Sequence, residues 1–438
     1  MISCLAYIIY GIILQEKCLG VNNMRFIDLF AGAGGLSEGF LRQGFEPVAH
    51  IEMNLYASQT LMTRTAYYHL KNEGKLDIYT DYLLKKITRE ELLACLPYNI
   101  EDIVINKEIT DESISQIFNT IDNNLNRTSD GKIDVLIGGP PCQAYSLVGR
   151  ARDPYGKERD PRNYLYKQYV KFLKKYQPEL FVFENVPGIL NAAKGSLFED
   201  VKSFMEEAGY EIEPRLLNAA DFGVMQQRKR VILIGWKKGR GNLYPDFKKI
   251  EQPFSVGDIL CDLPHLEPGE EKNIYAGNPT EYLSKYAIRE KNDILTHHVT
   301  RVNNERDREI YRFAIKLWNS EKKRLKYTEL PESLITHKNL TSFLDRFKVV
   351  GADLPYSHTV VAHIAKDGHY YIHPDIDQAR SLSVREAARL QSFPDNFFFE
   401  GPRTAIFTQI GNAVPPLMAE QIAVKIRQML KNENESDL

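Results

Sequence analysis

One cysteine stands where a reactive group is expected. Cys142 follows Pro140 and Pro141 shortly after the apolar run Val135–Ile137, which is typical of a strand followed by a rigid loop. Reactive groups of α/β proteins lie at the carboxyl ends of parallel strands, so this thiol is a candidate nucleophile. Taken alone, a single cysteine is more often an inert buried residue.

Charged residues beside two other apolar runs could meet this thiol. Glu184 ends the run that begins at Leu180, and its carboxylate is therefore expected at the same edge of the sheet. Arg228 and Arg230 stand two residues apart before the run Val231–Gly235, so both side chains are expected on one face. A solvated run of charges is the alternative interpretation of these arginines.

A glycine-rich segment near the start of the chain could bind a nucleotide-like cofactor. The run Phe26–Phe30 is followed by Ala31-Gly32-Ala33-Gly34-Gly35, and glycines in a strand-to-helix turn let the backbone approach a ligand. The dinucleotide fingerprint G-x-G-x-x-G is incomplete, because Ser37 occupies its last position. Glu52 ends the next run, where an acid commonly binds ribose hydroxyls, and Met53 could lie against an adenine ring. The alternatives are a tight packing turn and a core methionine.

A sheet must position these residues. From Met24 onward, short apolar runs alternate with helical stretches, and such runs are typical of strands buried on both faces. The runs are Phe26–Phe30, Val48–Ile51, Ile103–Ile105, Val135–Ile137, Leu180–Phe183, Arg215–Leu217 and Val231–Gly235. We therefore predict an open, Rossmann-like α/β sheet of about seven strands. Residues 62–100 are predicted to form an inserted helical hairpin.

The pattern changes after residue 240, which predicts a second, smaller domain. Residues 241–403 lack clean βα alternation and are rich in Pro, Gly, His and charge. Residues 417–430 return to helical spacing, and this helix is expected to pack on the first domain. We predict a catalytic domain formed by residues 24–240 plus 404–438. Residues 1–23 are interpreted as an N-terminal extension outside the fold, with Met24 as the functional start.

Six segments together resemble the cytosine-C5 DNA methyltransferase family of the bacterial restriction–modification type. They follow the family's order and are Phe26–Phe40, Asp134–Ser146, Phe183–Pro187, Ala219–Val231, Arg380–Asp395 and Gln409–Ala419. The resemblance implies an S-adenosylmethionine-dependent methyltransferase fold, with residues 241–403 as the target recognition domain. It also implies methyl transfer to C5 of cytosine within a specific double-stranded DNA sequence, after the base is flipped out of the helix.

The resemblance further implies roles for the site residues. Cys142 would add to C6 of the cytosine as a thiolate. Glu184 would contact N3 and the exocyclic amine, Arg230 would contact O2, and Arg228 would help to hold the loop, the base or the backbone. S-adenosylmethionine would be bound by Phe30, Ala33, Gly35, Glu52, Met53, Glu108, Ile109, Pro141, Leu165 and Asn412. Glu108 stands where the family usually has Asp.

The charge composition limits the kind of partner. The 438 residues include 56 Lys and Arg and 58 Asp and Glu, for a net charge of −2. This excludes a wholly basic nucleic-acid binder but not a local basic face. Residues 301–350 carry twelve Lys and Arg against seven Asp and Glu, which suits a phosphate-facing surface. A solvated helix is the alternative. Arg385 and Glu386 are expected to be mainly structural.

No metal site and no membrane segment are predicted. The five cysteines form no CxxC pair, and His297, His298 and His373 are isolated from other metal ligands. The apolar run Cys4–Leu14 is too short to span a bilayer. We expect a cytoplasmic monomer whose partner is double-stranded DNA. The resemblance also implies a cognate restriction endonuclease that acts on the same site, with a solitary enzyme as the alternative.

Two alternative functions stay open. A transfer-RNA cytosine-C5 methyltransferase would share the fold, but that branch usually carries a Cys-Phe-Thr signature in the recognition region. Here Cys261, the only cysteine after Cys142, is followed by Asp262, which favours DNA. A catalytically silent, cofactor-binding regulator is the second alternative. Such a regulator is expected to have lost Cys142, Glu184 or Arg230, and all three are present.

Overall fold

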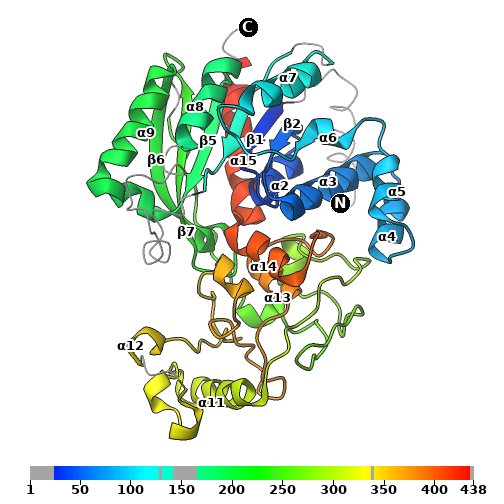
Figure 1. Ribbon diagram of the computed structural model, residues 1–438, viewed down its shortest axis with the longest axis vertical. Helices are drawn as coiled ribbons and strands as arrows, with labels where there is room; N and C mark the ends of the chain where they lie inside the picture. Colours follow the sequence, from blue (N-terminus) through cyan, green and yellow to red (C-terminus); the bar gives the residue numbers. More distant parts are fainter. Residues whose placement is uncertain (1–23, 128–130, 142–164, 242, 337–339, 435–438) are drawn as a thin grey trace, which may run out of the picture.

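A seven-stranded sheet forms the centre of the structure (Figure 1), a computed structural model that describes residues 24–127, 131–141, 165–241, 243–336 and 340–434. The strand order is β3-β2-β1-β4-β5-β7-β6. The strands are β1 (Arg25–Leu29), β2 (Glu46–Ile51), β3 (Val104–Ile105), β4 (Val135–Gly138), β5 (Leu180–Asn185), β6 (Tyr210–Asn218) and β7 (Lys229–Lys237). Each coincides with one of the apolar runs, so the predicted Rossmann-like α/β sheet is confirmed.

The direction of β7 sets the geometry of the sheet edge. Strands β1 to β5 pair in parallel, whereas β7 runs antiparallel to both β5 and β6. The register places Asn185 at the end of β5 opposite Val231 near the start of β7. The amino end of β7 therefore lies at the same edge as the carboxyl ends of the parallel strands.

Helices cover both faces of the sheet (Figure 1). The helices of the described residues are α2 (Gly35–Arg42), α3 (Leu55–Asn72), α4 (Leu76–Leu83), α5 (Arg89–Ala94), α6 (Ile100–Ile103), α7 (Ile114–Leu125), α8 (Leu165–Tyr176), α9 (Ser196–Glu207), α10 (Glu281–Lys285), α11 (Glu305–Glu321), α12 (Leu340–Phe343), α13 (Val384–Leu390), α14 (Arg403–Asn412) and α15 (Pro416–Asn434). Helices α11 and α12 lie away from the sheet (Figure 1). Because side chains alternate along a strand, Phe26 packs with α2 and α15, whereas Ile27 packs with α7, α8 and α9. Each face thus has its own apolar core.

The C-terminal helix packs on the first helix of the sheet domain, as the spacing of residues 417–430 predicts. Leu417, Ile422 and Ile426 of α15 are buried in the same core as α2. At the helix surfaces, Glu420 accepts hydrogen bonds from Arg42 Nη1 and Gln43 Nε2, both at 3.1 Å. Segments from the two ends of the described chain therefore form one layer.

The predicted helical hairpin at residues 62–100 is wrong in its details. The single long helix α3 is followed by three short helices, α4, α5 and α6. The chain breaks at Gly74, which has a left-handed backbone, and Thr88 then starts α5 with a capping box. The buried Arg64 of α3 forms an ion pair of 2.6 Å with Glu38 of α2, which fixes this segment to the sheet domain.

A separate apolar cluster lies in the region predicted to be the second domain. It gathers around α11 and includes Ile310, Tyr311, Trp318 and Phe347. Other residues between 244 and 399, such as Tyr282 and Phe393, share the core of the sheet domain instead. The domain boundaries at 240 and 403 stay a prediction. Within the described ranges, no helix has the length and apolar character needed to cross a membrane.

A buried network of charges holds the 380–397 segment. Arg389 of α13 is fully buried and binds Asp262 at 2.6 Å and Asp395 at 2.6 Å. Burial raises the pKa of Asp395, but the charge of Arg389 outweighs it, so the pKa lies below its usual value. The pairing thus keeps a buried carboxylate ionised.

Arg389→Leu is expected to destabilise the protein by about 3–5 kcal/mol, because it leaves two buried carboxylates without their main counter-charge. Urea unfolding followed by tryptophan fluorescence measures the free energy of unfolding. Trp236 and Trp318 lie in different apolar clusters, so the signal reports on both. The matched control is Arg312→Leu, which breaks the exposed pair with Glu305 and should cost less than about 1 kcal/mol. Equal losses in the two variants would contradict the structural role.

Candidate active site

Glu184 and Arg230 meet at the carboxyl edge of the sheet. Arg230 Nε lies 2.7 Å from Glu184 Oε1, and both side chains are close to 90% buried, with 11% and 13% exposed. They meet because β7 begins beside the end of β5. This pair is the expected acid and arginine of the site, placed side by side.

The loop after β4 passes directly over this pair. A Cβ atom on Gly139 would lie 2.5 Å from Glu184 Oε2, so a side chain at this position would push the carboxylate away from its present place. Asn185 Nδ2 donates to the carbonyl oxygen of Pro140 at 3.3 Å and ties the loop to β5. Pro141 is exposed and leads into Cys142, which lies outside the described residues, as does the rest of 142–164. The described part of the loop thus brings the chain to Glu184 three residues before the cysteine in the sequence.

Arg228 is placed differently from the expectation that both arginines lie on one face. Its guanidinium is fully buried and donates to the carbonyl oxygens of Val360, Gly411 and Ala413 at 2.6, 3.0 and 2.8 Å. Burial, together with the charge of Arg230, lowers the pKa of Arg228 well below its usual value. Of the three roles implied by the resemblance, holding the backbone is the one that this geometry supports.

The glycine-rich loop is held by Glu52. The carboxylate accepts the backbone N–H of Gly32 at 2.8 Å and that of Asn54 at 2.7 Å. Burial raises the pKa of Glu52, although these hydrogen bonds oppose the shift. Gly32 and Phe30 both have a positive φ of 57°, which is uncommon for a residue with a side chain. A Cβ on Gly32 would meet nothing within 4 Å, so the backbone is open to a ligand here.

The other expected cofactor residues differ in their exposure. Met53 is 62% exposed at the sheet edge, whereas Ile109 is buried. Leu165 begins α8, and Asn412 ends α14 with its side chain exposed. Ala33, Gly35, Glu108 and Pro141 complete the set, of which the first two are buried and the last two exposed. An open loop beside a carboxylate and an exposed apolar side chain fits a nucleoside with a ribose and an adenine ring.

Two residues that position the site were missed in the sequence. Asn106 Nδ2 donates to the carbonyl oxygens of Glu52 and Met53 at 2.8 and 3.1 Å. Gln226 Nε2 donates to the side chain of Gln391 at 2.7 Å. Asn106 directly follows β3, and a polar residue at the end of a parallel strand is a signal that could have found it. Nothing local in the sequence indicates the partners of Gln226.

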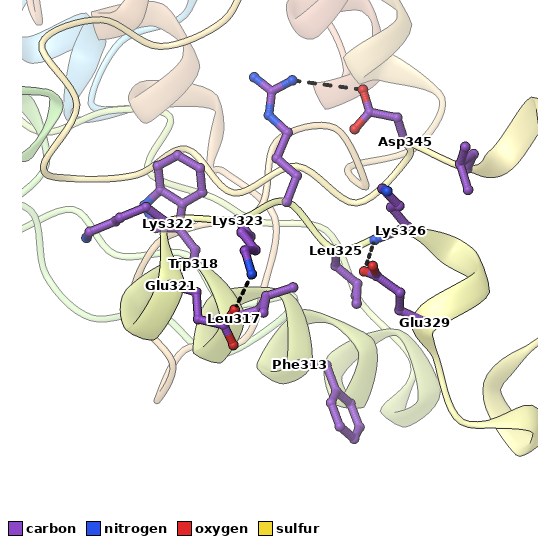
Figure 2. A pocket seen from close by; sticks show the side chains of 12 residues that line it. Phe313, Leu317, Trp318, Glu321, Lys322, Lys323, Leu325, Lys326, Glu329 and Asp345 are labelled. Carbon is purple, nitrogen blue, oxygen red and sulfur yellow. Dashed lines mark hydrogen bonds and ion pairs between the residues drawn. The ribbon is translucent and has the colours of Figure 1, made fainter.

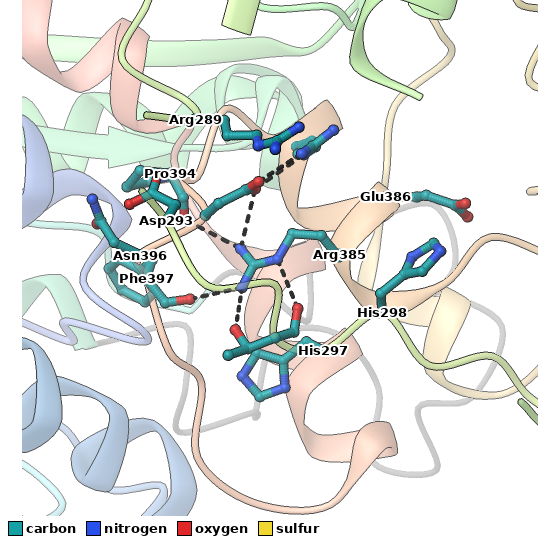
Figure 3. Close-up of polar contacts among 12 residues, drawn as sticks. Arg289, Asp293, His297, His298, Arg385, Glu386, Pro394, Asn396 and Phe397 are labelled. Carbon is teal, nitrogen blue, oxygen red and sulfur yellow. Dashed lines mark hydrogen bonds and ion pairs between the residues drawn. The ribbon is translucent and has the colours of Figure 1, made fainter. Parts of the chain in front are cut away.

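Arg385 and Glu386 are buried structural residues, as expected. Figure 3 shows Arg385 with its guanidinium directed at backbone atoms of Pro394 and Phe397, to which it donates at 3.1 and 3.2 Å. Glu386 binds Arg380 at 2.7 Å, and the pKa of Glu386 is lowered despite burial. Among the described residues, no group of three or more His, Cys, Asp and Glu is arranged to hold a metal ion.

The basic segment 301–350 surrounds a hollow of about 1020 Å³ at the end of α11 (Figure 2). Its apolar wall includes Phe313, Leu317 and Trp318. The cations at its rim are largely paired, since Lys323 lies 2.7 Å from Glu321 and Lys322 lies 2.8 Å from Asp353. A contact of this segment with phosphates stays a prediction.

Comparisons with known proteins show the family of the chain. The model of the family "C-5 cytosine-specific DNA methylase" matches residues 24–99 and 90–428. The type II methyltransferase M.Bpa9945I of Bacillus paralicheniformis is 42% identical over 94% of this chain and 100% of its own length. The type II methyltransferase M1.HphI of Haemophilus parahaemolyticus is 31% identical over 96% of this chain and 91% of its own.

Solved structures share the fold. A crystal structure of a DNA modification methyltransferase encoded within an E. coli prophage has a TM-score of 0.62, with 23% identity over 93% of this chain and all of that one. The Entamoeba histolytica methyltransferase EhMeth has a TM-score of 0.52, with 16% identity over 94% of this chain and 99% of that one. The chain belongs to the C-5 cytosine-specific DNA methylase family. It is a DNA (cytosine-5-)-methyltransferase, as the motif order predicts.

Proposed function

We propose that the protein methylates C5 of cytosine within one specific double-stranded DNA sequence, with S-adenosylmethionine as the methyl donor. The observation that carries the proposal is the Glu184–Arg230 pair of 2.7 Å, which lies against the loop that leads to Cys142. A base stacked inside a duplex cannot enter such a site, so the target cytosine is flipped out first, at a cost of a few kcal/mol.

The reaction begins on the ring carbon next to C5. The thiolate of Cys142 forms a bond to C6, and the electron pair of the C5–C6 double bond shifts toward N3. Glu184 contacts N3 and the exocyclic amine and supplies the proton that N3 takes up. Arg230 donates to O2 and stabilises the charge that develops on the ring. These two groups act together because their ion pair fixes both side chains at one edge of the sheet.

The cofactor would bind along the glycine-rich loop. Glu52 would take the ribose hydroxyls, while Met53 would support the adenine ring and Asn412 would approach from the C-terminal segment. S-adenosylmethionine, when bound, supplies the methyl group that the activated C5 accepts. A base then takes the proton from C5, the C5–C6 double bond forms again as the bond between C6 and the Cys142 sulfur breaks, and N3 returns its proton to Glu184, which restores the free enzyme.

We also propose a restriction–modification setting. The supporting observation is that M.Bpa9945I and M1.HphI are both named as type II methyltransferases. In this setting the protein works as a cytoplasmic monomer beside a restriction endonuclease that acts on the same DNA sequence.

Bisulfite sequencing tests the proposed function. The chain is expressed in cells whose DNA carries no 5-methylcytosine, and both genomic DNA and transfer RNA are sequenced. We expect complete protection of cytosine at one short DNA sequence and no change in the RNA. Protected cytosines in transfer RNA alone would support the alternative substrate. Unprotected cytosines in both, from a protein that is folded and binds S-adenosylhomocysteine, would favour the silent regulator.

A further inference from the structure

Three segments that are distant in the sequence meet at Arg228. The first is residues 226–230, which lead into β7 and carry Arg230. The second is residues 357–362, from the region assigned to DNA recognition, and the third is residues 411–413, from the C-terminal segment beside the cofactor loop. Arg228 Nη1 donates to Val360 at 2.6 Å, and Nη2 donates to both Gly411 and Ala413. One side chain therefore joins all three segments.

Backbone contacts make the first two segments a continuous unit. The N–H of Gln227 donates to the carbonyl of Ser357 at 2.9 Å, and the N–H of Ser357 donates to the carbonyl of Met225 at 2.9 Å. The N–H of Val360 donates to Gln226 Oε1, also at 2.9 Å. Movement of residues 357–360 would thus be transmitted to the strand that carries Arg230.

The second and third segments are in direct contact. A Cβ atom on Gly411 would lie 2.2 Å from the backbone nitrogen of Ala362, so residues 361–362 cross the end of α14 without a gap. One step further, the carbonyl oxygen of Val414 lies 2.3 Å from the place where Gly35 would carry a Cβ. Because Gly35 begins α2 directly after the glycine-rich loop, this contact chain runs from the recognition region to the cofactor loop.

The charge of Arg228 explains why an arginine is needed here. Within the described residues its guanidinium forms no ion pair with a carboxylate, and its hydrogen bonds are the three that Nη1 and Nη2 donate to carbonyl oxygens. A planar guanidinium reaches acceptors in two directions at once, whereas a lysine ammonium is a single point charge. Only arginine can hold residues 360 and 411–413 together at these distances.

We propose that Arg228 is a positioning residue that couples the binding of DNA to the binding of the cofactor. DNA contact fixes the positions of residues 357–362. Through its hydrogen bonds, Arg228 then fixes residues 411–413 as well, so that the cofactor binds a glycine-rich loop whose neighbours are already in place. Binding free energies that are linked in this way act equally in both directions. The inference rests on the proposed function for the identity of the two ligands.

The test measures the affinity for S-adenosylhomocysteine by calorimetry, with and without a duplex that carries the sequence found by bisulfite sequencing. In the wild-type protein, the duplex should raise this affinity by about 5- to 150-fold. In Arg228→Lys, the increase should fall to about 1- to 2-fold, while the affinity measured without DNA changes much less. The KM values for both substrates should rise more than kcat falls.

The control variant is Arg385→Lys. Arg385 is another fully buried arginine that donates to backbone carbonyls, those of Thr296, Pro394 and Phe397, away from the junction at Arg228. Arg385→Lys should be less stable than the wild-type protein, but the duplex should still raise its affinity for S-adenosylhomocysteine by the wild-type factor. Should Arg228→Lys fail to fold, Gly411→Ala strains the contact between residues 361–362 and the end of α14. It should also reduce the factor by which the duplex raises the affinity for S-adenosylhomocysteine.

Three results would overturn the proposal. The duplex could raise the affinity of Arg228→Lys for S-adenosylhomocysteine as much as that of the wild-type protein. The increase in affinity could be lost in Arg385→Lys as well, or the duplex could leave the affinity of the wild-type protein unchanged. Methyl transfer measured on the same wild-type preparation shows separately whether the proposed function has failed as well.

Discussion

Cys142→Ser is expected to reduce methyl transfer to cytosine by about three orders of magnitude or more, because a serine hydroxyl does not form the nucleophile that adds to C6. Transfer of a labelled methyl group from S-adenosylmethionine to a duplex with the target sequence measures this. The variant should keep its thermal unfolding midpoint and its affinity for S-adenosylhomocysteine. Wild-type turnover in Cys142→Ser would show that the reaction does not pass through this thiol.

A substrate analogue gives an independent readout of the same step. A duplex with 5-fluorocytosine at the target position should trap the wild-type protein as a covalent adduct, since fluorine cannot leave C5 as a proton does. Denaturing gel electrophoresis detects the adduct, and peptide mass spectrometry should place it on Cys142. Cys142→Ser should give none. An adduct on another residue would reassign the nucleophile.

Glu184→Gln should lower kcat by about 10²- to 10⁴-fold, the usual range for the loss of a positioned proton donor. The substitution preserves the shape of the side chain but removes the acid that can give a proton to N3 and that, when ionised, pairs with Arg230 at 2.7 Å. Single-turnover rates with saturating duplex separate this loss from weaker DNA binding.

Glu179→Gln is the matched control for this experiment. Glu179 precedes the first residue of β5 and also forms ion pairs, with Lys237 at 3.0 Å and Arg240 at 3.1 Å. It therefore stands at the opposite end of the strand that carries Glu184. Activity near the wild-type value is expected. A similar loss in both variants would indicate a general effect of unpaired charges on β5 instead of chemistry at N3.

The sheet could be predicted because most of its strands are apolar on both faces. The runs at Phe26, Val135 and Leu180 are buried between helices, and burial on two sides leaves a continuous signal in the sequence. Strand β6 is much longer than the run Arg215–Leu217, because most of its residues are partly exposed and carry no such signal. The antiparallel direction of β7 has no local signature either.

The site was predictable in its residue types more than in its contacts. Glu184 and Arg230 meet only through the antiparallel pairing of β5 and β7. Arg228 and Arg230 were expected on one face because strand side chains alternate, but β7 begins at Lys229. Arg228 is therefore outside the strand and turns into the interior. Its acceptors are more than 100 residues away in the sequence, and no local pattern indicates them.

The packing of α15 against α2 has a consequence for the order in which the protein can be made. Residues 36 and 40 leave the ribosome long before the residues that cover them, such as Met418 and Ile422, are synthesised. Contacts between such distant parts of a chain form late and slow the folding of a domain. This layer of the sheet domain can therefore become complete only after α15 has been synthesised, and a nascent chain without α15 exposes an apolar face that other chains could bind.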